Sequence, residues 1–283
     1  MRYTVFKASV GMAFSIGVMM IASGFSILGH AEAHTGKVKD VIRISTGEYP
    51  PLTSKYIRDN GFLNHLIKEA FAYSGVEVEF VFMPWLRSMD AAMNNEVHAT
   101  SFWAMKEEYK QYFVPSQYSL SGDYVFYYFG DTPPFDQWES LSDFSSYKIG
   151  VARGHSYTNE FWNAVKDRTL TVEYVNDNTQ NLKKLIAGRL DFLLIDRAIG
   201  QYLIGQHFYN QKEQLNYLKK PIGNVPAYVL FSKSNSRALR YKALYELGVQ
   251  YLMESGQLKK MRAALTEGYY DSQNQSVVSH ATP

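Results

Sequence analysis

The sequence predicts an α/β protein with two lobes, each a mostly parallel sheet flanked by helices, joined by two extended chain crossings. From residue 40 onward, runs with strand-like alternation are followed by runs with helical periodicity, which is typical of parallel sheets covered by helices. A segment rich in Pro, Ser and Asp, 130–146, interrupts this order before it starts again. The last segment, 225–270, offers one strand and two helices with no α/β unit of its own, so we expect it to return to the first lobe.

The first lobe is expected to follow a βαβαβ order. We expect strands at 40–46, 76–83 and 98–103, and helices at 61–75, from Pro84 onward, and at 106–113. Apolar residues recur on one stripe of 61–75, and Gly75 is a typical residue just beyond a helix end. Pro84 suits the first position of the next helix, where its missing N–H is not needed.

The second lobe repeats the alternation after the break. Strands are expected at 147–152, 170–175, 189–196 and 215–220, and helices at 156–167, 178–188 and 197–208. The crossings are expected near 120–130 and 223–232, where they would act as a hinge. These boundaries assign 34–126 and 225–270 to the first lobe and 127–224 to the second, and leave 271–283 as a polar, disordered tail.

The first 33 residues have the pattern of a secretory signal peptide. Arg2 and Lys7 precede an uncharged apolar run, and an Ala-Glu-Ala triplet ends at Ala33. We expect cleavage after Ala33, so that the mature chain begins at His34. The alternative is an uncleaved membrane anchor, because the apolar run approaches the roughly 20 residues that span a bilayer.

Composition excludes several classes of function. The chain has no cysteine, which rules out disulfides, thiol catalysis and cysteine metal sites and fits a bacterial periplasm. Removing 1–33 lowers the formal net charge from +2 to +1, which gives no electrostatic reason to bind nucleic acid. Four histidines lie on separate predicted elements, so no metal site is expected: His65, His98, His155 and His207.

A resemblance to a known family is carried by six segments together: "TGEYPPL", "GFLNHLIKEAFAYSG", "PWLRSMDAAMNNEVHAT", "VARGHSY", "NLKKLIAGRLDFLLID" and "YVLFSKSN…LMESGQLKKM". Over roughly 41–268 the chain resembles the family 3 periplasmic solute-binding proteins, which include the polar amino-acid receptors of ABC importers. The resemblance implies a type II periplasmic-binding-protein fold, a monomer that encloses a small polar solute, amino-acid-like or otherwise anionic or zwitterionic, and transient docking on a membrane permease. It implies no cofactor.

Two other functions stay open at this stage. Some proteins of this fold are periplasmic enzymes, including dehydratases that use a carboxylate, and others are sensors that act on a membrane receptor. The sequence shows no serine–histidine–acid arrangement, and "GHSYT" lacks the second glycine of a nucleophile elbow, so no catalytic residue is expected.

In open α/β sheets, ligands bind beyond the carboxyl ends of the strands. This rule selects nine candidate ligand-binding residues: Glu48, Tyr49, Trp85, Arg87, Trp103, Arg153, Ser156, Tyr157 and Asp196. Each has a structural alternative. The tryptophans would serve equally as core, and Glu48, Ser156 and Asp196 as helix caps. Arg87 would pair with Asp90 on an exposed helix face.

In one respect the sequence differs from the family's pattern. The family's amino-acid receptors carry an arginine after the third strand that clamps the solute's α-carboxylate, whereas this chain has Tyr109 and Lys110 there. Neither side chain provides a bidentate fork. The anion-binding role then falls to Arg87 or Arg153, or the solute is not a simple amino acid. The resemblance also implies that Asp196 takes the solute's ammonium group.

Overall fold

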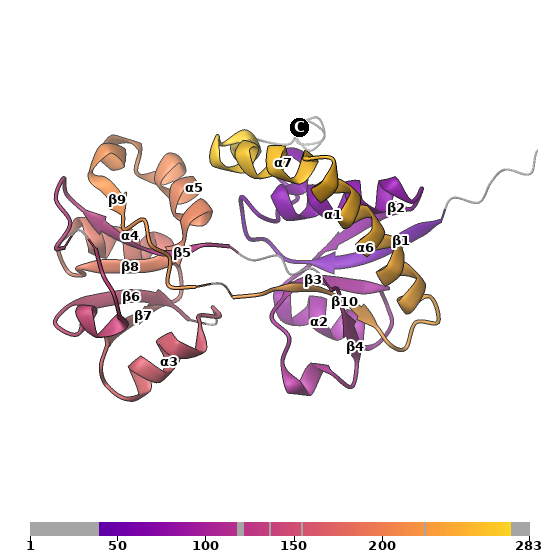
Figure 1. The fold of residues 1–283 in the computed structure, drawn as a ribbon, viewed down its shortest axis with the longest axis horizontal. Helices are drawn as coiled ribbons and strands as arrows, with labels where there is room; N and C mark the ends of the chain where they lie inside the picture. Colours follow the sequence, from indigo (N-terminus) through magenta and orange to yellow (C-terminus); the bar gives the residue numbers. More distant parts are fainter. Residues whose placement is uncertain (1–39, 118–121, 136, 154, 224, 273–283) are drawn as a thin grey trace, which may run out of the picture. The chain divides into compact units, whose positions relative to one another are not determined.

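The computed structural model describes residues 40–117, 122–135, 137–153, 155–223 and 225–272 (Figure 1). The described residues belong to one compact unit. The predicted signal peptide, its cleavage site and all but the first two residues of the predicted tail lie outside them. No helix in the described ranges has the length and apolar character needed to cross a membrane.

The first lobe contains a five-stranded sheet in the order β2-β1-β3-β10-β4. Its strands are β1 (Val41–Thr46), β2 (Glu77–Phe82), β3 (Ala99–Trp103), β4 (Phe113–Pro115) and β10 (Tyr228–Ser232). β1 runs parallel to β2 and β3, whereas β10 runs antiparallel to β3 and β4. As the sequence predicts, the return segment completes this sheet.

The second lobe has an equivalent sheet in the order β7-β6-β8-β5-β9. Its strands are β5 (Tyr124–Phe129), β6 (Lys148–Ala152), β7 (Thr171–Val175), β8 (Phe192–Asp196) and β9 (Leu215–Tyr217). β6 is parallel to β7 and β8, and β5 is antiparallel to β8 and β9. In each sheet, the antiparallel fourth strand is the one that the chain enters after crossing from the other lobe.

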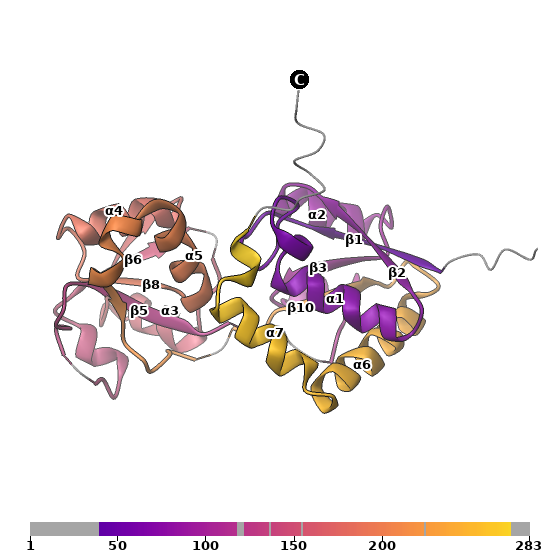
Figure 2. The ribbon, with the colours of Figure 1, turned by 90° about the horizontal axis from the view of Figure 1, so that it is seen from above.

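Helices cover the sheets. The first lobe carries α1 (Phe62–Tyr73), α2 (Trp85–Met93), α6 (Ala238–Glu254) and α7 (Gln257–Thr266), and the second carries α3 (Asn159–Lys166), α4 (Asn178–Ile186) and α5 (Arg197–His207). α6 packs along α1, and both contact α7, as the view from above in Figure 2 shows. Buried apolar residues of α1 and α6, such as Phe71 and Tyr245, form the core beneath them.

Short 3-10 helices connect several of these elements. They are η1 (Arg58–Asn60), η2 (Glu107–Tyr109), η3 (Leu141–Phe144), η4 (Tyr209–Gln214) and η5 (Tyr269–Asp271). η5 therefore includes Asp271, the first residue of the predicted tail.

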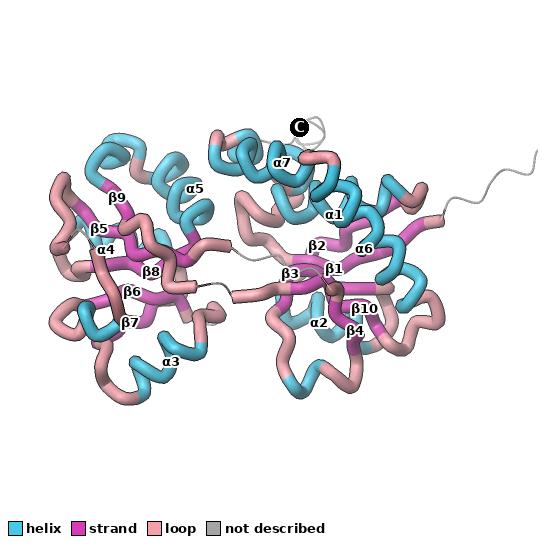
Figure 3. Tube along the Cα trace, viewed as in Figure 1, coloured by secondary structure: helices cyan, strands magenta, loops and turns pink. Residues whose placement is uncertain are grey.

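The structure differs from the sequence prediction at one connection of the first lobe (Figure 3). The helix expected at 106–113 is the single 3-10 turn η2, and Phe113 instead begins β4, because Phe113–Pro115 pairs with β10. The crossing near 120–130, expected to be extended, includes the strand β5, whose central residues are buried. The predicted lobe boundary between 126 and 127 falls within this strand.

Candidate ligand-binding site

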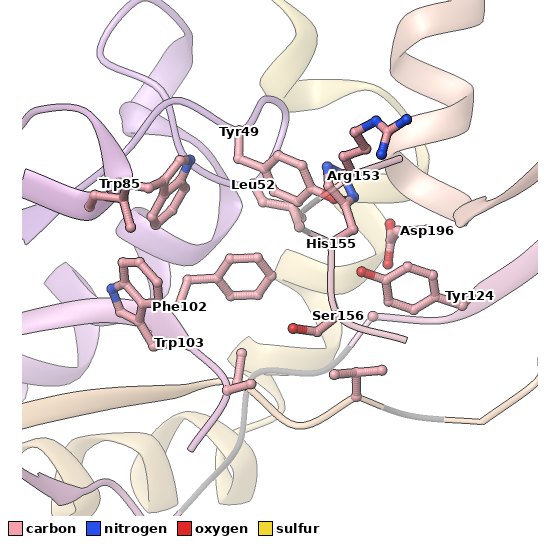
Figure 4. Close-up of a pocket in the computed structure, with 15 residues that line it drawn as sticks. Tyr49, Leu52, Trp85, Phe102, Trp103, Tyr124, Arg153, His155, Ser156 and Asp196 are labelled. Atoms are coloured by element: carbon pink, nitrogen blue, oxygen red, sulfur yellow. The ribbon is translucent and has the colours of Figure 1, made fainter. Parts of the chain in front are cut away.

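A cavity of about 410 Å³ is lined by residues of both lobes and of the two crossings (Figure 4). This volume lies in the range of roughly 300–1,000 Å³ that is typical of small-molecule sites. The lining residues are Tyr49, Leu52, Trp85, Leu86, Phe102, Trp103, Ala104, Gly122, Tyr124, Arg153, His155, Ser156, Asp196, Val225 and Ala227. Six of the nine residues predicted from the sequence are among them: Tyr49, Trp85, Trp103, Arg153, Ser156 and Asp196.

Two tryptophans form one wall of the cavity. Trp85 begins α2 and Trp103 ends β3, and their rings meet edge to face with centroids 5.5 Å apart. A Cβ atom on Gly47, just after β1, would overlap the Trp85 indole, so the glycine allows this ring to lie against the backbone. Both tryptophans are half-buried and line the cavity.

Buried hydroxyl groups hold Trp103 in place. Its Nε1 donates to Thr100 Oγ1 at 2.9 Å. Thr100 Oγ1 donates to the Ser45 carbonyl oxygen at 3.2 Å and lies 2.8 Å from Ser88 Oγ. With Ser88 as the donor in that contact, the threonine hydroxyl uses its one proton and both lone pairs.

Phe102 has an unusual backbone that allows it to share the cavity with its neighbour. Successive residues of a regular strand face opposite sides of the sheet, so Phe102 and Trp103 would not line one space. Phe102 has φ = 63°, in the left-handed region, and the register with β10 shifts close by, between Tyr228 and Leu230. Both rings therefore reach the cavity.

Asp196 is the buried carboxylate of the site. It ends β8, is 4% exposed, and its Oδ1 accepts hydrogen bonds from the backbone N–H groups of Ala198 and Ile199, which caps α5. Burial raises the pKa of Asp196 to about 6, although these hydrogen bonds act in the opposite direction. A Cβ on Gly122 would overlap Asp196 Oδ2, so the glycine leaves room for the carboxylate. The residue thus has the predicted cap role and also faces the cavity.

A contact between the lobes lies beside this carboxylate. The Tyr49 hydroxyl is 3.3 Å from His155 Nδ1, and the two rings meet edge to face with centroids 5.5 Å apart. Burial lowers the pKa of His155, which favours the neutral imidazole. Burial also raises the pKa values of Tyr49 and Tyr124, so both phenols keep their protons.

The loop after β6 supplies Arg153 and Ser156. Arg153 is exposed, and its guanidinium carbon lies 5.4 Å from the centre of the Tyr174 ring. Ser156 lines the cavity. The sequence also offered it as the cap of the following helix, and the structure does not show that role. Thr158 is the cap of α3, because the helix begins at Asn159 and Thr158 Oγ1 accepts from Phe161 N–H.

Three predicted residues lie outside the cavity lining. Glu48 is exposed, and its Oε1 accepts from the Lys55 N–H at 3.2 Å. Arg87 is exposed on α2. Tyr157 is buried in the second lobe's core, where its hydroxyl accepts from the Ala152 N–H and donates to the Leu194 carbonyl. That Glu48, Arg87 and Tyr157 contact a ligand directly therefore stays a prediction.

The two positions at which the resemblance predicts a clamping arginine, Tyr109 and Lys110, are also outside the described lining. Tyr109 packs edge to face on Trp103, with centroids 6.5 Å apart. Lys110 Nζ pairs with Glu107 Oε1 at 2.6 Å on the surface. Tyr109 thus contacts the wall residue Trp103 without lining the cavity, and no lysine is among the described lining residues.

Sequence reasoning missed nine lining residues: Leu52, Leu86, Phe102, Ala104, Gly122, Tyr124, His155, Val225 and Ala227. Gly122, Tyr124, Val225 and Ala227 lie on or beside the two predicted crossings, so the crossings themselves were the usable signal. His155 lies next to Ser156 in a loop that was already singled out. Nothing in the sequence pattern indicated the left-handed backbone at Phe102.

Within the described ranges, no group of three or more His, Asp or Glu side chains is arranged to hold a metal ion. The described cavity lining therefore contains no such set of metal ligands.

Comparisons with known proteins identify the fold. No protein-family model and no curated protein sequence matches the chain. Among solved structures, it is similar to the second substrate-binding domain of GlnP from Lactococcus lactis in its open conformation, with 17% identity and a TM-score of 0.61 over 84% of this chain and 98% of that one.

Two further structures show the same similarity. An amino-acid ABC transporter substrate-binding protein from Streptococcus pneumoniae, bound to L-arginine, has 17% identity and a TM-score of 0.57 over 81% of this chain and 95% of that one. A histidine kinase sensor domain similar to periplasmic binding proteins has 18% identity and a TM-score of 0.59 over 80% and 96%. The chain therefore has the two-lobed fold of the periplasmic binding proteins, in the form found in substrate-binding proteins of amino-acid ABC transporters.

Proposed function

We propose that the protein is a solute-binding protein that captures a small polar solute and releases it chemically unchanged. The observation that carries this proposal is the cavity of about 410 Å³ lined by both lobes and by the crossings that connect them. A site built in this way changes when the lobes move about the crossings, which is how hinged binding proteins enclose ligands. The fold that the chain shares with substrate-binding proteins supports the same conclusion.

The proposed mechanism is hinge closure around the solute. First-lobe rings, Trp85 and Trp103, would contact its body, and second-lobe groups, Ser156 and Asp196, would complete the enclosure. Asp196 suits an ammonium group, because a buried carboxylate is stabilised by a cationic partner. An amino-acid-like solute carries such a group.

We further propose that the loaded protein docks transiently, as a monomer, on the permease of an ABC importer in the periplasm. This proposal is supported by similarity to substrate-binding proteins of such importers and by the signal-peptide pattern of 1–33. Protein purified from the periplasm should begin at His34 by N-terminal sequencing. A retained Met1 in the membrane fraction would contradict the proposed location.

A sensor role is the second candidate, because the solved neighbours include a histidine kinase sensor domain. Uptake of the identified solute by cells that lack the protein separates the two functions. An importer component is required for uptake at low solute concentration. Uptake that is unchanged in its absence would favour the sensor.

The first test is to denature purified protein and identify released small molecules by mass spectrometry. A solute present at a free concentration of 100 times its dissociation constant should stabilise the folded protein by about 2.7 kcal/mol, which a thermal-shift measurement detects. Recovery of the solute unchanged after long incubation supports binding without turnover. Conversion to a product would show an enzyme instead.

A further inference from the structure

The lining of the cavity divides by chemistry between the two lobes. The first lobe and the second crossing contribute apolar or aromatic side chains, such as Trp85, Phe102 and Val225. The acidic group of the lining, Asp196, comes from the second lobe, as does its permanent cation, Arg153. The solute therefore meets a largely apolar wall on one side and a buried carboxylate on the other.

The cavity has poor provision for a solute carboxylate. Arg153 is exposed, lies over the ring of Tyr174, and points away from Trp85 and Trp103 in Figure 4. His155 is held neutral by burial, which lowers its pKa. Among the described lining residues there is no other arginine and no lysine. Tyr109, one of the two positions where the resemblance predicts a carboxylate-clamping arginine, packs edge to face on Trp103 and is outside the described lining.

Asp196, in contrast, has no dedicated cationic partner among the residues that the structure describes. The guanidinium of the neighbouring Arg197 is engaged by Asp123, with Nη2 2.9 Å from Oδ2. The two backbone N–H groups that cap α5 donate to Asp196 Oδ1, so neither bond uses Oδ2. A buried carboxylate requires a cation or further hydrogen bonds to offset its lost hydration. A positively charged ligand group supplies that partner.

From this arrangement we infer that the solute is an organic amine without a carboxylate, with its ammonium head at Asp196 and an apolar or aromatic body along Trp85, Phe102 and Trp103. This inference rests on the proposed solute-binding function and narrows its solute class. An apolar or aromatic body packs favourably against these three aromatic side chains. Their ring faces also attract a cationic head that lies near them. An α-amino acid would bring a carboxylate that the described lining does not neutralise at this wall.

Three probes that share a phenyl ring and a two-carbon chain test the inference by isothermal titration at neutral pH. 2-Phenylethylamine carries the ammonium alone, phenylalanine adds the carboxylate, and 2-phenylethanol replaces the charge with a hydroxyl. We expect the amine to bind at least tenfold more tightly than either of the others. Equal or tighter binding of phenylalanine overturns the exclusion of the carboxylate, and equal binding of the alcohol overturns the role of the cation.

A second matched pair extends the test to longer solutes. Agmatine is arginine without its carboxylate, so the inference predicts tighter binding of agmatine. Tighter binding of arginine would overturn it.

Variants locate the recognised charge. Asp196→Asn should remove the preference for the amine over the alcohol, since asparagine keeps the cap and loses the charge. Asp177→Asn is a matched control, because Asp177 caps α4 in the same lobe through the Thr179 N–H, is exposed and lies outside the cavity lining. A preference for the amine that survives in Asp196→Asn overturns the assignment.

If none of the probes binds, the solute that the protein enriches from a metabolite extract decides the question by mass spectrometry. An enriched amine without a carboxylate upholds the inference. An enriched carboxylate-bearing solute overturns it and leaves the solute-binding function standing. Failure to enrich any small molecule overturns the solute-binding function itself.

Discussion

The two lobes share a sheet topology but contribute different chemistry to the cavity. In the orders β2-β1-β3-β10-β4 and β7-β6-β8-β5-β9, equivalent strands occupy equivalent places. At the end of β3 the first lobe places Trp103, whereas at the end of the corresponding strand, β8, the second lobe places Asp196. The shared topology fixes where the strand ends meet the cavity, and the residues at those ends decide what is recognised.

Loss of the second lobe's carboxylate should have the largest effect on binding. Asp196→Asn removes the buried charge, and for a cationic solute such a change typically costs about 2–5 kcal/mol of binding free energy. Isothermal titration of the identified solute measures this effect. Unchanged affinity would show that the second lobe does not provide the charged contact.

The same substitution should stabilise the empty protein. A folded-state pKa of about 6, raised from the ordinary 3.8, corresponds to up to about 3 kcal/mol of unfavourable charging at pH 7. The wild-type carboxyl therefore supports folding fully below about pH 4 and loses this contribution as pH rises to about 6. We expect Asp196→Asn to raise the melting temperature at pH 7, with little difference from wild type at pH 4.

The charged and titratable groups around Asp196 are Asp123, Arg197, Tyr49, Tyr124 and Tyr127, with His155 beside them in contact with Tyr49. Burial lowers the pKa of His155, and Asp196→Asn leaves this histidine in place, so its titration is common to both proteins. None of the three tyrosines titrates between pH 4 and 7, because burial raises their pKa values. A melting-temperature difference independent of pH would contradict the assignment to Asp196.

Two glycines provide a paired test of smaller effect: Gly47, which faces Trp85 in the first lobe, and Gly122 on the first crossing, which faces the second lobe's Asp196. Gly122→Ala would push against Asp196 Oδ2, and Gly47→Ala against the Trp85 indole. Displacing a well-packed group by one methyl typically costs about 1–3 kcal/mol. We expect Gly122→Ala to weaken preferentially the binding of charged solutes, and Gly47→Ala to weaken amine and neutral probes alike, as titrations with 2-phenylethylamine and 2-phenylethanol would show. An identical pattern in both variants would contradict the division between the lobes.

Thr100→Val tests how the first lobe holds its aromatic wall. It removes the acceptor of the Trp103 indole N–H while nearly preserving volume, and should cost about 1–3 kcal/mol of stability. Binding should weaken a fewfold, with a change in tryptophan fluorescence. Thr171→Val, at an exposed strand position of the second lobe, is the control and should change neither measurement.

Arg87→Ala should have the smallest effect. The sequence predicted a ligand contact for Arg87, yet its side chain is exposed and outside the described lining. We expect the affinity to stay within twofold of wild type, as for Asp90→Ala. A loss of about 2–5 kcal/mol of binding free energy in Arg87→Ala, without a loss in Asp90→Ala, would support the predicted ligand contact. The first lobe would then also contribute a charged group.

The fold was predictable because its signals are local and periodic. Alternation in 76–83 and the helical stripe in 61–75 anticipate β2 and α1, and the lack of an α/β unit after 225 indicated the return of β10 to the first sheet. The 106–113 prediction failed because the partner of Phe113–Pro115 is β10, more than 100 residues later in the chain. Local propensity carries no information about such a partner.

The candidate site was predictable to a smaller extent. The rule about strand ends finds Trp85, Trp103 and Asp196, since it depends only on where each strand stops. It also selected Tyr157, whose side chain is in the core instead of the cavity, because position on a loop does not fix side-chain direction. The rule did not select Phe102, because sequence position did not reveal where its side chain points. Its left-handed backbone accompanies the register shift opposite β10.

The sheet topology also has a consequence for the order of folding. All five strands of the second lobe lie within one continuous stretch, Tyr124–Tyr217, whereas the first lobe's sheet requires β10 between β3 and β4. Until Tyr228–Ser232 has joined the sheet, β4 and the edge of β3 that faces away from β1 lack their strand partner in the described sheet. We expect pulse-labelled hydrogen exchange during refolding to protect β6 and β8 before β3 and β4, which makes the chain with an unfinished first sheet the aggregation-prone stage of folding.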